Sequence, residues 1–263
     1  MSNLIKASNF ALTMQYMELF QQGMITTILL SALTVLFGFM LALVLALARM
    51  SNVRPLRFLS IDRNGLLREQ GFLTFLSRFN PLSAIATIYV EIIRATPMLV
   101  QLWLVYNLLF HKSVINIPQK TVLGFIRLER FIPGVVALAL NSGAYLSEII
   151  RSGIQSIDGG QTEAARSLGL TQVQNMRYIV LPQAIKNILP AIANEFVTII
   201  KESAITYTIG VGDIMAAVNA AKGALYIIIE PLLVATLMYF CLTFPTSKLI
   251  AYFERRMRRG DVR

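Results

Sequence analysis

The chain has 263 residues, of which 56% are apolar and 14% charged, and its mean hydropathy is +0.62. Soluble globular domains carry about a quarter charged residues, so this composition excludes an ordinary soluble protein. The net charge of +10 does not indicate a nucleic-acid partner, because no basic face with interleaved aromatic residues accompanies it. Membrane proteins collect Lys and Arg in cytoplasmic loops, which accounts for the excess.

A short amphipathic stretch precedes the first long apolar run. Four of its apolar residues recur at helical spacing, which predicts an interfacial helix within residues 1–22: Phe10, Met14, Met17 and Phe20. Residues 24–48 then contain no charged side chain. These 25 residues exceed the roughly 20 that a helix needs to cross a bilayer core. Only Lys6 precedes them, unlike the basic region of a signal peptide, so we predict a retained transmembrane helix that lies toward lipid.

Four further apolar stretches bring the predicted number of spans to five: about 84–110, 131–150, 185–201 and 225–253. The middle three spans carry charges, amides, Gly or Pro, which a membrane tolerates where they face protein or a water-filled cavity. We therefore expect them to line an interior path. The fold class is an all-α integral membrane protein, with residues 1–263 as one membrane domain.

The distribution of basic residues predicts the orientation. Segments 49–84, 151–186 and 254–263 hold 15 Lys and Arg, against 7 in segments 1–23, 111–130 and 201–224. By the positive-inside rule the first set is cytoplasmic, so the N-terminus lies outside and the C-terminus inside. The four basic residues in 111–130 run against this trend.

Segment 151–184 predicts two short helices outside the membrane. Gly159-Gly160 breaks the preceding element, and Thr162 is a candidate cap for a helix over residues 163–168. Gly169 stands where a helix commonly ends in a left-handed residue.

The second short helix follows at once. Thr171 and Gln174 have the spacing of a capping box, which predicts a helix through about Val180, and Pro182 disfavours its continuation. Such a helix pair fits a groove on a partner, because Ala164 and Ala165 permit close approach and Glu163 offers an anionic contact. The alternative is an ordinary helix-turn-helix connection.

The pattern E-A-A-x3-G-x9-I-x-L-P, from Glu163 to Pro182, resembles the EAA loop of bacterial ABC importer permeases. Three further segments make the chain similar, from end to end, to the polar amino-acid class of these permeases: 91–101 (EIIRATPMLVQ), 141–154 (NSGAYLSEIIRSGI) and 194–204 (NEFVTIIKESA). The sequence departs from the family at Ala95, where Gly is common, and in segment 55–82, which is longer than the compact family loop.

The resemblance implies a type I ABC importer fold and the residues that couple it to an ATPase: Glu163, Ala164, Ala165, Gly169, Leu181 and Pro182. It also implies two ATPase subunits, a second permease copy or sister permease, and an extracytoplasmic amino-acid receptor, all at a bacterial inner membrane. ATP-Mg belongs to the ATPase, and no cofactor or metal is expected on this chain, which lacks a GxxxxGK[ST] loop.

Polar residues within the predicted spans are candidates for the substrate path. Glu195, beside Asn194, has no basic residue three or four positions away, so it is a candidate ligand for an ammonium group. The alternative is a buried Glu bonded to a neighbouring helix or the other protomer. The third span adds weaker candidates: Asn141, Ser142 and Tyr145. Two acid–base pairs at helical spacing favour structural salt bridges instead: Glu91 with Arg94, and Glu148 with Arg151.

Other classes of function remain open at this point. An ATP-independent carrier or channel would be expected to show a pore loop or an inverted repeat, and neither is visible. An enzyme or a scaffold is the third class, and a single histidine, His111, and a single cysteine, Cys241, argue against an enzyme. The substrate also stays open between glutamine or glutamate and basic amino acids.

Overall fold

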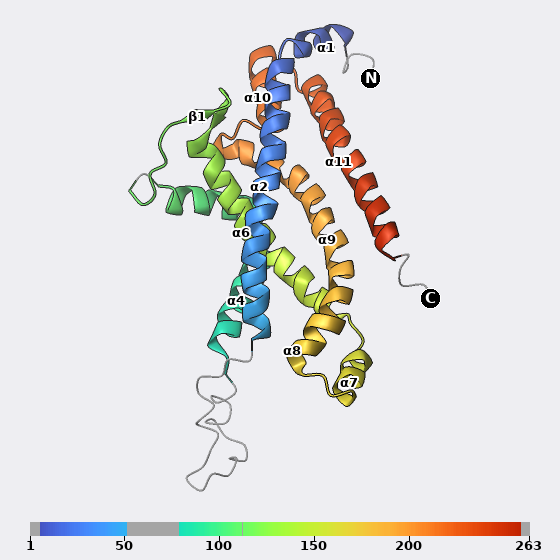
Figure 1. Ribbon diagram of the computed structural model, residues 1–263. Coiled ribbons are helices and arrows are strands. Elements are labelled where there is room, and N and C mark those ends of the chain that lie inside the picture. Colours follow the sequence, from blue (N-terminus) through green and yellow to red (C-terminus); the bar gives the residue numbers. More distant parts are fainter. Residues whose placement is uncertain (1–5, 52–78, 112, 259–263) are drawn as a thin grey trace.

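The computed structural model describes residues 6–51, 79–111 and 113–258 (Figure 1). Segment 52–78, and with it most of the long basic loop, lies outside the described residues. The described residues are mainly α-helical: α1 (Ala7–Met14), α2 (Met17–Met50), α4 (Pro81–Ala95), α5 (Met98–Leu104), α6 (Leu128–Gln155), α7 (Gly159–Ser167), α8 (Gln172–Asn175), α9 (Leu181–Glu202), α10 (Ile214–Leu225) and α11 (Ile229–Arg258). Two π-helical segments, Val105–Leu109 and Met176–Val180, and one 3-10 helix, Ser203–Ile209, extend these helices. The described strands β1 (Thr121–Val122) and β2 (Ile126–Arg127) form a small antiparallel hairpin.

Among the described residues, three helices are each long and apolar enough to cross a membrane: α2, α6 and α11. Two bent pairs reach the same criterion only together. One joins Pro81–Ala95 to Met98–Leu109 at 113°, and the other joins Gln172–Ile209 to Ile214–Leu225 at 47°. Five spans are therefore reached only if each bent pair counts as one span.

The span predicted over about 84–110 is not one continuous helix. The helix stops at Ala95, and Thr96 is extended with φ −114° and ψ 147°. Pro97 causes the break, because its ring disfavours helical geometry in the preceding residue and it has no N–H to donate. The last span is also displaced: Tyr226, with φ 56°, ends α10, and α11 begins only at Ile229.

The prediction that the first span lies toward lipid holds for only part of α2. A third of its most apolar window (33%) is buried, against 11% for α11, so α11 is the more exposed span. Helix α2 lies along α6 (Figure 1), and a Cβ placed on Gly38 would lie 3.2 Å from the Ser142 side chain. Small residues on both helices permit this approach, which apolar length alone does not reveal.

The predicted N-terminal helix is present as α1. Phe10 and Met17 pack with buried Phe20 against Ile214 of α10, so they cover protein. The carboxylate of Glu230 accepts hydrogen bonds from the Lys6 backbone N–H (3.1 Å) and the Asn9 amide (2.9 Å), which ties α1 to the start of α11. The position of α1 at a membrane surface stays a prediction.

The two ends of the molecule differ in character. Helices α7 and α8 lie at one end, whereas α1 and α10 lie at the other, with the β1–β2 hairpin towards that side (Figure 1). Two of the basic residues in 111–130 have local partners there: Arg127 donates to the Gly210 carbonyl (3.4 Å) and Arg130 to the Ile209 carbonyl (3.3 Å). These arginines stabilise the chain after α9, which explains their presence against the charge trend.

Candidate coupling loop and substrate path

The first helix of the 151–184 loop begins earlier than predicted. Helix α7 starts at Gly159, and the Asp158 side chain caps it by accepting the Gly160 N–H at 2.9 Å. Thr162 is therefore not the cap, because Asp158 is an equally good acceptor one turn earlier. Thr162 instead accepts a hydrogen bond from the Asn175 amide at 3.1 Å, which joins α7 to α8.

The turn between the two short helices follows the prediction. Gly169 has φ +84°, in the left-handed region, and the Leu170 N–H donates to the Ala165 carbonyl at 3.1 Å. The capping box is also present: the Gln174 N–H donates to the Thr171 hydroxyl (3.3 Å), and the Thr171 N–H donates to the Gln174 side chain (2.9 Å). Local sequence therefore determines this turn.

The prediction that Pro182 ends the second helix is wrong. The chain stays helical from Gln172 to Glu202, passing through a π-helical turn at Met176–Val180. Leu181 begins α9, and Pro182 directly follows the π-helical turn, so the chain stays helical although proline has no N–H to donate. Leu181 and Pro182 thus join the short helices directly to α9.

The loop presents an apolar surface that the sequence interpretation missed. Leu168 is 83% exposed and Val173 is 76% exposed, beside exposed Glu163 and Ala164. Ala165 is only 3% exposed, so its side chain packs inside the loop. Apolar residues in an otherwise polar loop were the available signal. Exposed apolar side chains of this size are available to bury their area against another protein.

The five predicted substrate-path residues do not form one cluster. The Ser142 hydroxyl donates to the Glu195 carboxylate at 3.3 Å, across α6 and α9. Asn141 instead donates to the buried Gln101 side chain at 2.9 Å. Gln101 in turn donates to the carbonyls of Ile93 (2.7 Å) and Thr96 (3.0 Å), so Asn141 supports the bend at Pro97.

The other two predicted residues lie apart from that pair. Tyr145 is 39% exposed, and the Arg94 guanidinium lies 5.5 Å from its ring centroid, as in a cation–π contact. Asn194 is exposed on α9, and its backbone carbonyl accepts the Thr198 hydroxyl. Among the five, Ser142 and Glu195 are therefore the pair joined by a side-chain hydrogen bond.

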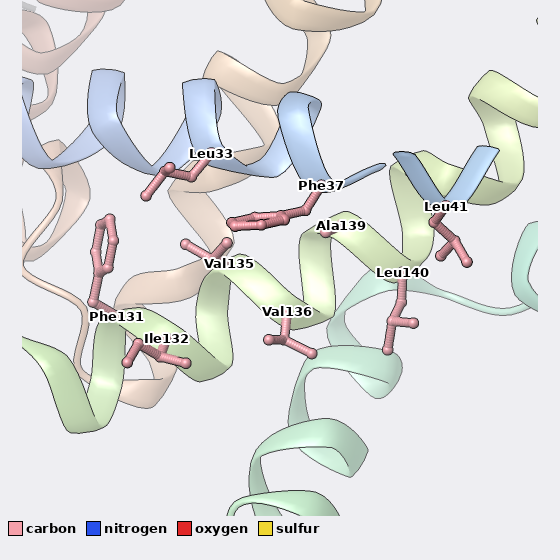
Figure 2. A pocket seen from close by; sticks show the side chains of 9 residues that line it. All are labelled: Leu33, Phe37, Leu41, Phe131, Ile132, Val135, Val136, Ala139 and Leu140. Atoms are coloured by element: carbon pink, nitrogen blue, oxygen red, sulfur yellow. The ribbon is translucent and has the colours of Figure 1, made fainter. Parts of the chain in front are cut away.

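An apolar groove of about 490 Å³ lies between α2 and α6 (Figure 2). Its walls consist entirely of aliphatic and aromatic side chains: Leu33, Phe37, Leu41, Phe131, Ile132, Val135, Val136, Ala139 and Leu140. None of the predicted substrate-path residues lines it. A groove without hydrogen-bonding side chains does not suit a polar amino acid.

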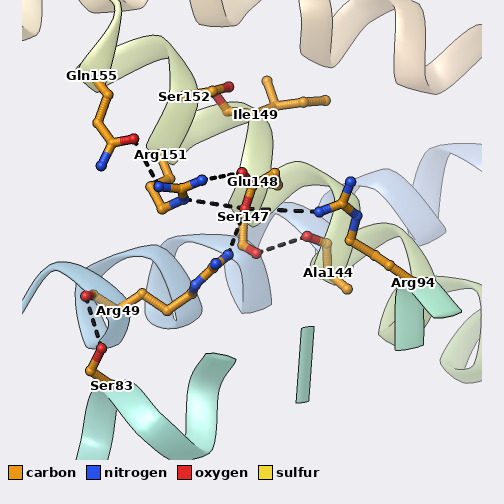
Figure 3. A network of polar contacts seen from close by, with 10 residues as sticks. All are labelled: Arg49, Ser83, Arg94, Ala144, Ser147, Glu148, Ile149, Arg151, Ser152 and Gln155. Atoms are coloured by element: carbon orange, nitrogen blue, oxygen red, sulfur yellow. Dashed lines mark hydrogen bonds and ion pairs between the residues drawn. The ribbon is translucent and has the colours of Figure 1, made fainter. Parts of the chain in front are cut away.

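Glu148 forms the centre of an ionic cluster with three arginines (Figure 3). Its carboxylate lies 2.7 Å from Arg49 of α2 and 4.0 Å from Arg94 of α4, and it also contacts Arg151 of its own helix. The predicted Glu148–Arg151 pair is therefore present. The predicted Glu91–Arg94 pair is not among the ion pairs of the described residues, because Arg94 turns towards Glu148.

The described residues contain three continuous candidate spans and two bent ones, and an exposed helical loop joins α6 to α9. This architecture defines a multi-span membrane permease subunit. The chain belongs to the family of binding-protein-dependent transport system inner membrane components, whose model matches residues 71–259.

Individual relatives agree with this assignment over nearly the whole chain. The chain is 36% identical over 253 residues to the arginine transport system permease protein ArtQ of Bacillus subtilis (strain 168), covering 96% of this chain and 99% of the relative. It is 32% identical to the putative glutamine transport system permease protein GlnP of Rickettsia conorii, with 90% and 91% covered. A crystal structure of an amino acid ABC transporter with histidines matches with a TM-score of 0.76 at 40% identity, covering 94% of this chain and 98% of that one.

Proposed function

We propose that this chain is the membrane-spanning permease of an ATP-driven importer for polar amino acids, either basic amino acids or glutamine and glutamate. The exposed helix pair α7–α8, with Leu168 and Val173 on its surface, carries this proposal because it is the part of the permease available to a motor subunit. The arginine and glutamine permeases among the relatives support the substrate class.

The proposed assembly contains two ATPase subunits, a second copy of this chain or a sister permease, and an extracytoplasmic receptor. ATP-Mg is bound and hydrolysed by the ATPase, and this chain holds no cofactor. The membrane is a bacterial inner membrane, with the N-terminus outside and the C-terminus in the cytoplasm. The positive-inside rule supports this orientation, as does the position of α1 at the end opposite α7 and α8 (Figure 1).

Movement of the loop would reach two spans at once. Helix α6 precedes α7, and α9 follows the turn after α8. The two spans are tightly packed near the loop: a Cβ placed on Gly153 would lie 2.4 Å from Ile188. A displacement of α7 and α8 therefore changes the angle of α6 and α9 together, and these helices carry Ser142 and Glu195.

For docking, we predict that Leu168→Asp abolishes recovery of the ATPase with the purified permease. A carboxylate at a desolvated apolar contact costs about 2–4 kcal/mol, which weakens binding about thirtyfold to a thousandfold. The measurement is the amount of ATPase that co-purifies with a tagged permease, normalised to permease. Leu123→Asp is the matched control, since Leu123 is an exposed leucine (60%) of the β1–β2 hairpin, which lies away from the loop.

Equal ATPase recovery with Leu168→Asp and Leu123→Asp would contradict docking at α7–α8. Two further substitutions act on the fold of the loop itself. A bulky residue at Ala165 is expected to disrupt the loop itself, because Ala165 is buried within it. Gly169→Asp is likewise expected to lower ATPase recovery while membrane insertion persists, because aspartate strains the left-handed turn.

For the substrate path, we predict that Glu195→Gln reduces uptake of a basic amino acid about tenfold to a hundredfold, with ATPase recovery unchanged. The change removes a charge-assisted hydrogen bond to an ammonium or guanidinium group, worth about 1.5–3 kcal/mol. The measurement is ATP-dependent uptake by proteoliposomes of the whole complex. Ser142→Ala is the graded control, because it removes only the 3.3 Å hydrogen bond to Glu195.

Unchanged uptake by the Glu195→Gln complex would remove Glu195 from the path. Uptake by the permease alone, without any ATPase, would favour the alternative of an ATP-independent carrier. The role of Glu195 and the ATP-driven importer function are thus tested separately, because unchanged uptake by the Glu195→Gln complex leaves the importer function intact.

A further inference from the structure

Three polar groups from three separate elements meet beside the start of α10. Asp213 is the N-cap of α10, Thr27 lies on α2 and Tyr239 on α11. Asp213 is 1% exposed and Thr27 is fully buried, and the hydroxyl oxygen of Tyr239 is buried as well. None of them belongs to the proposed coupling loop or substrate path.

The packing brings these groups together. A Cβ placed on Gly23, one turn before Thr27, would lie 2.6 Å from the Asp213 carbonyl oxygen, so α2 runs against the Asp213 backbone. Tyr239 packs on the buried cluster that contains Phe20 and Ile214, and its hydroxyl has Thr27 and Asp213 as neighbours. The three polar groups therefore border one small region.

Their hydrogen bonds are incomplete within the described part of the chain. One Asp213 carboxylate oxygen, Oδ1, accepts the Ala216 N–H at 2.8 Å. Its other oxygen, the Thr27 hydroxyl and the Tyr239 hydroxyl have no hydrogen bond of ordinary geometry to any described residue, although the two hydroxyls lie near enough to interact. Each buried polar group left unpaired costs about 1–3 kcal/mol, so the arrangement requires a partner.

The chemistry of the site favours water over a cation. Asp213 already sits at the N-terminus of α10, where backbone N–H groups and the helix dipole stabilise its negative charge and repel a cation. The site offers a carboxylate acceptor and two hydroxyls that can each donate or accept. A buried water typically makes about three hydrogen bonds, which matches these three groups.

We propose that Asp213, Thr27 and Tyr239 hold one ordered internal water molecule. The water accepts the Tyr239 hydroxyl proton and donates to the free carboxylate oxygen of Asp213 and to the Thr27 hydroxyl. It thereby links α11, the most exposed of the three continuous spans, to α2 and to the cap of α10. The site is a structural bridge and is independent of the proposed transport function.

A double-mutant cycle tests the bridge in the full-length purified protein. Thr27→Val and Tyr239→Phe remove one water ligand each, and each is expected to lower the apparent Tm by about 2–4 °C. Because both hydroxyls bind the same water, the double variant is expected to lose little more than either single variant. The control is Thr26→Val with Tyr239→Phe, since the Thr26 hydroxyl already donates to the Gln22 carbonyl at 2.9 Å. This control pair is expected to be additive.

Additive losses for Thr27→Val with Tyr239→Phe would overturn the water site. A Tm that depends on the choice of sodium or potassium would overturn it too, by pointing to a bound cation. Because a direct contact between the two hydroxyls would also make the losses non-additive, radiolytic hydroxyl-radical labelling of the unaltered protein decides between that contact and a shared water. Labelling also decides if the Tyr239 variant does not fold. Bound water is expected to speed the labelling of half-buried Tyr239, so Thr27→Val should slow it while the labelling of fully buried Phe20 stays unchanged. Equal labelling of Tyr239 in the unaltered protein and in Thr27→Val would overturn the proposal.

Discussion

Glu148→Gln is expected to destabilise the permease by about 3 kcal/mol, because it removes the carboxylate that forms the ion pairs of this cluster with three arginines in the described part of the chain. The Arg49 side chain is only 9% exposed, so its charge would be left buried without a counter-ion. The other two arginines are partly exposed and would recover hydration, which limits the total cost.

The loss would fall on the contact between α2, α4 and α6, which the Glu148 carboxylate joins through Arg49 and Arg94 (Figure 3). The measurement is thermal unfolding of the detergent-solubilised protein, in which about 3 kcal/mol corresponds to roughly 6–12 °C in Tm. Glu91→Gln is the matched control: Glu91 is exposed, and no ion pair to it occurs in the described part of the chain. It should change stability by at most about 0.5 kcal/mol. Equal Tm values for the two variants would contradict the role of Glu148.

Gly23→Val is expected to be at least as damaging, for a steric reason. A Cβ at this position would lie 2.6 Å from the carbonyl oxygen of Asp213 and 2.8 Å from the nitrogen of Ile214. These are backbone atoms, so no side chain can turn away to relieve the clash. Overpacking costs about 1–3 kcal/mol where side chains adjust, and the cost here should reach or exceed the upper end of that range.

Gly23→Ala tests the same contact with the smallest side chain and should already lower the Tm. Gly223→Ala is the control, because Gly223 lies in helix α10 with no atom near the added Cβ. That change should be neutral or stabilise the protein by up to about 1 kcal/mol, as expected for alanine in a helix. A wild-type Tm for Gly23→Ala would show that α2 and the start of α10 are not in close contact.

Much of the 151–184 loop was predictable because its geometry is local. Gly169 and the capping box of Thr171 and Gln174 have the predicted conformations, since each depends on residues within one helical turn. The errors in the same loop arose where two local choices competed. Asp158 and Thr162 are both good caps, and Pro182 is compatible with either a helix end or a first turn.

The candidate substrate path was less predictable. The sequence indicates polar residues in the spans but not their partners, and Asn141 proved to bond Gln101 while Ser142 bonds Glu195. Asn141 is 40 positions from Gln101, and Ser142 is 53 positions from Glu195. Their contacts therefore depend on how α5, α6 and α9 pack. The exposed apolar residues of the loop were visible in the sequence, but their exposure was not.

By itself, the sequence determined that the chain is helical, that it crosses a membrane and that its 151–184 loop contains two short helices. Apolar length, capping residues and turn glycines specify these features over short distances. Only the tertiary structure decided that α4 and α5 meet at a sharp bend, that one face of α2 is buried, and that Arg49 pairs with Glu148, 99 residues away. Such contacts depend on which helix faces approach one another, and the periodicity of a single helix does not specify its neighbour.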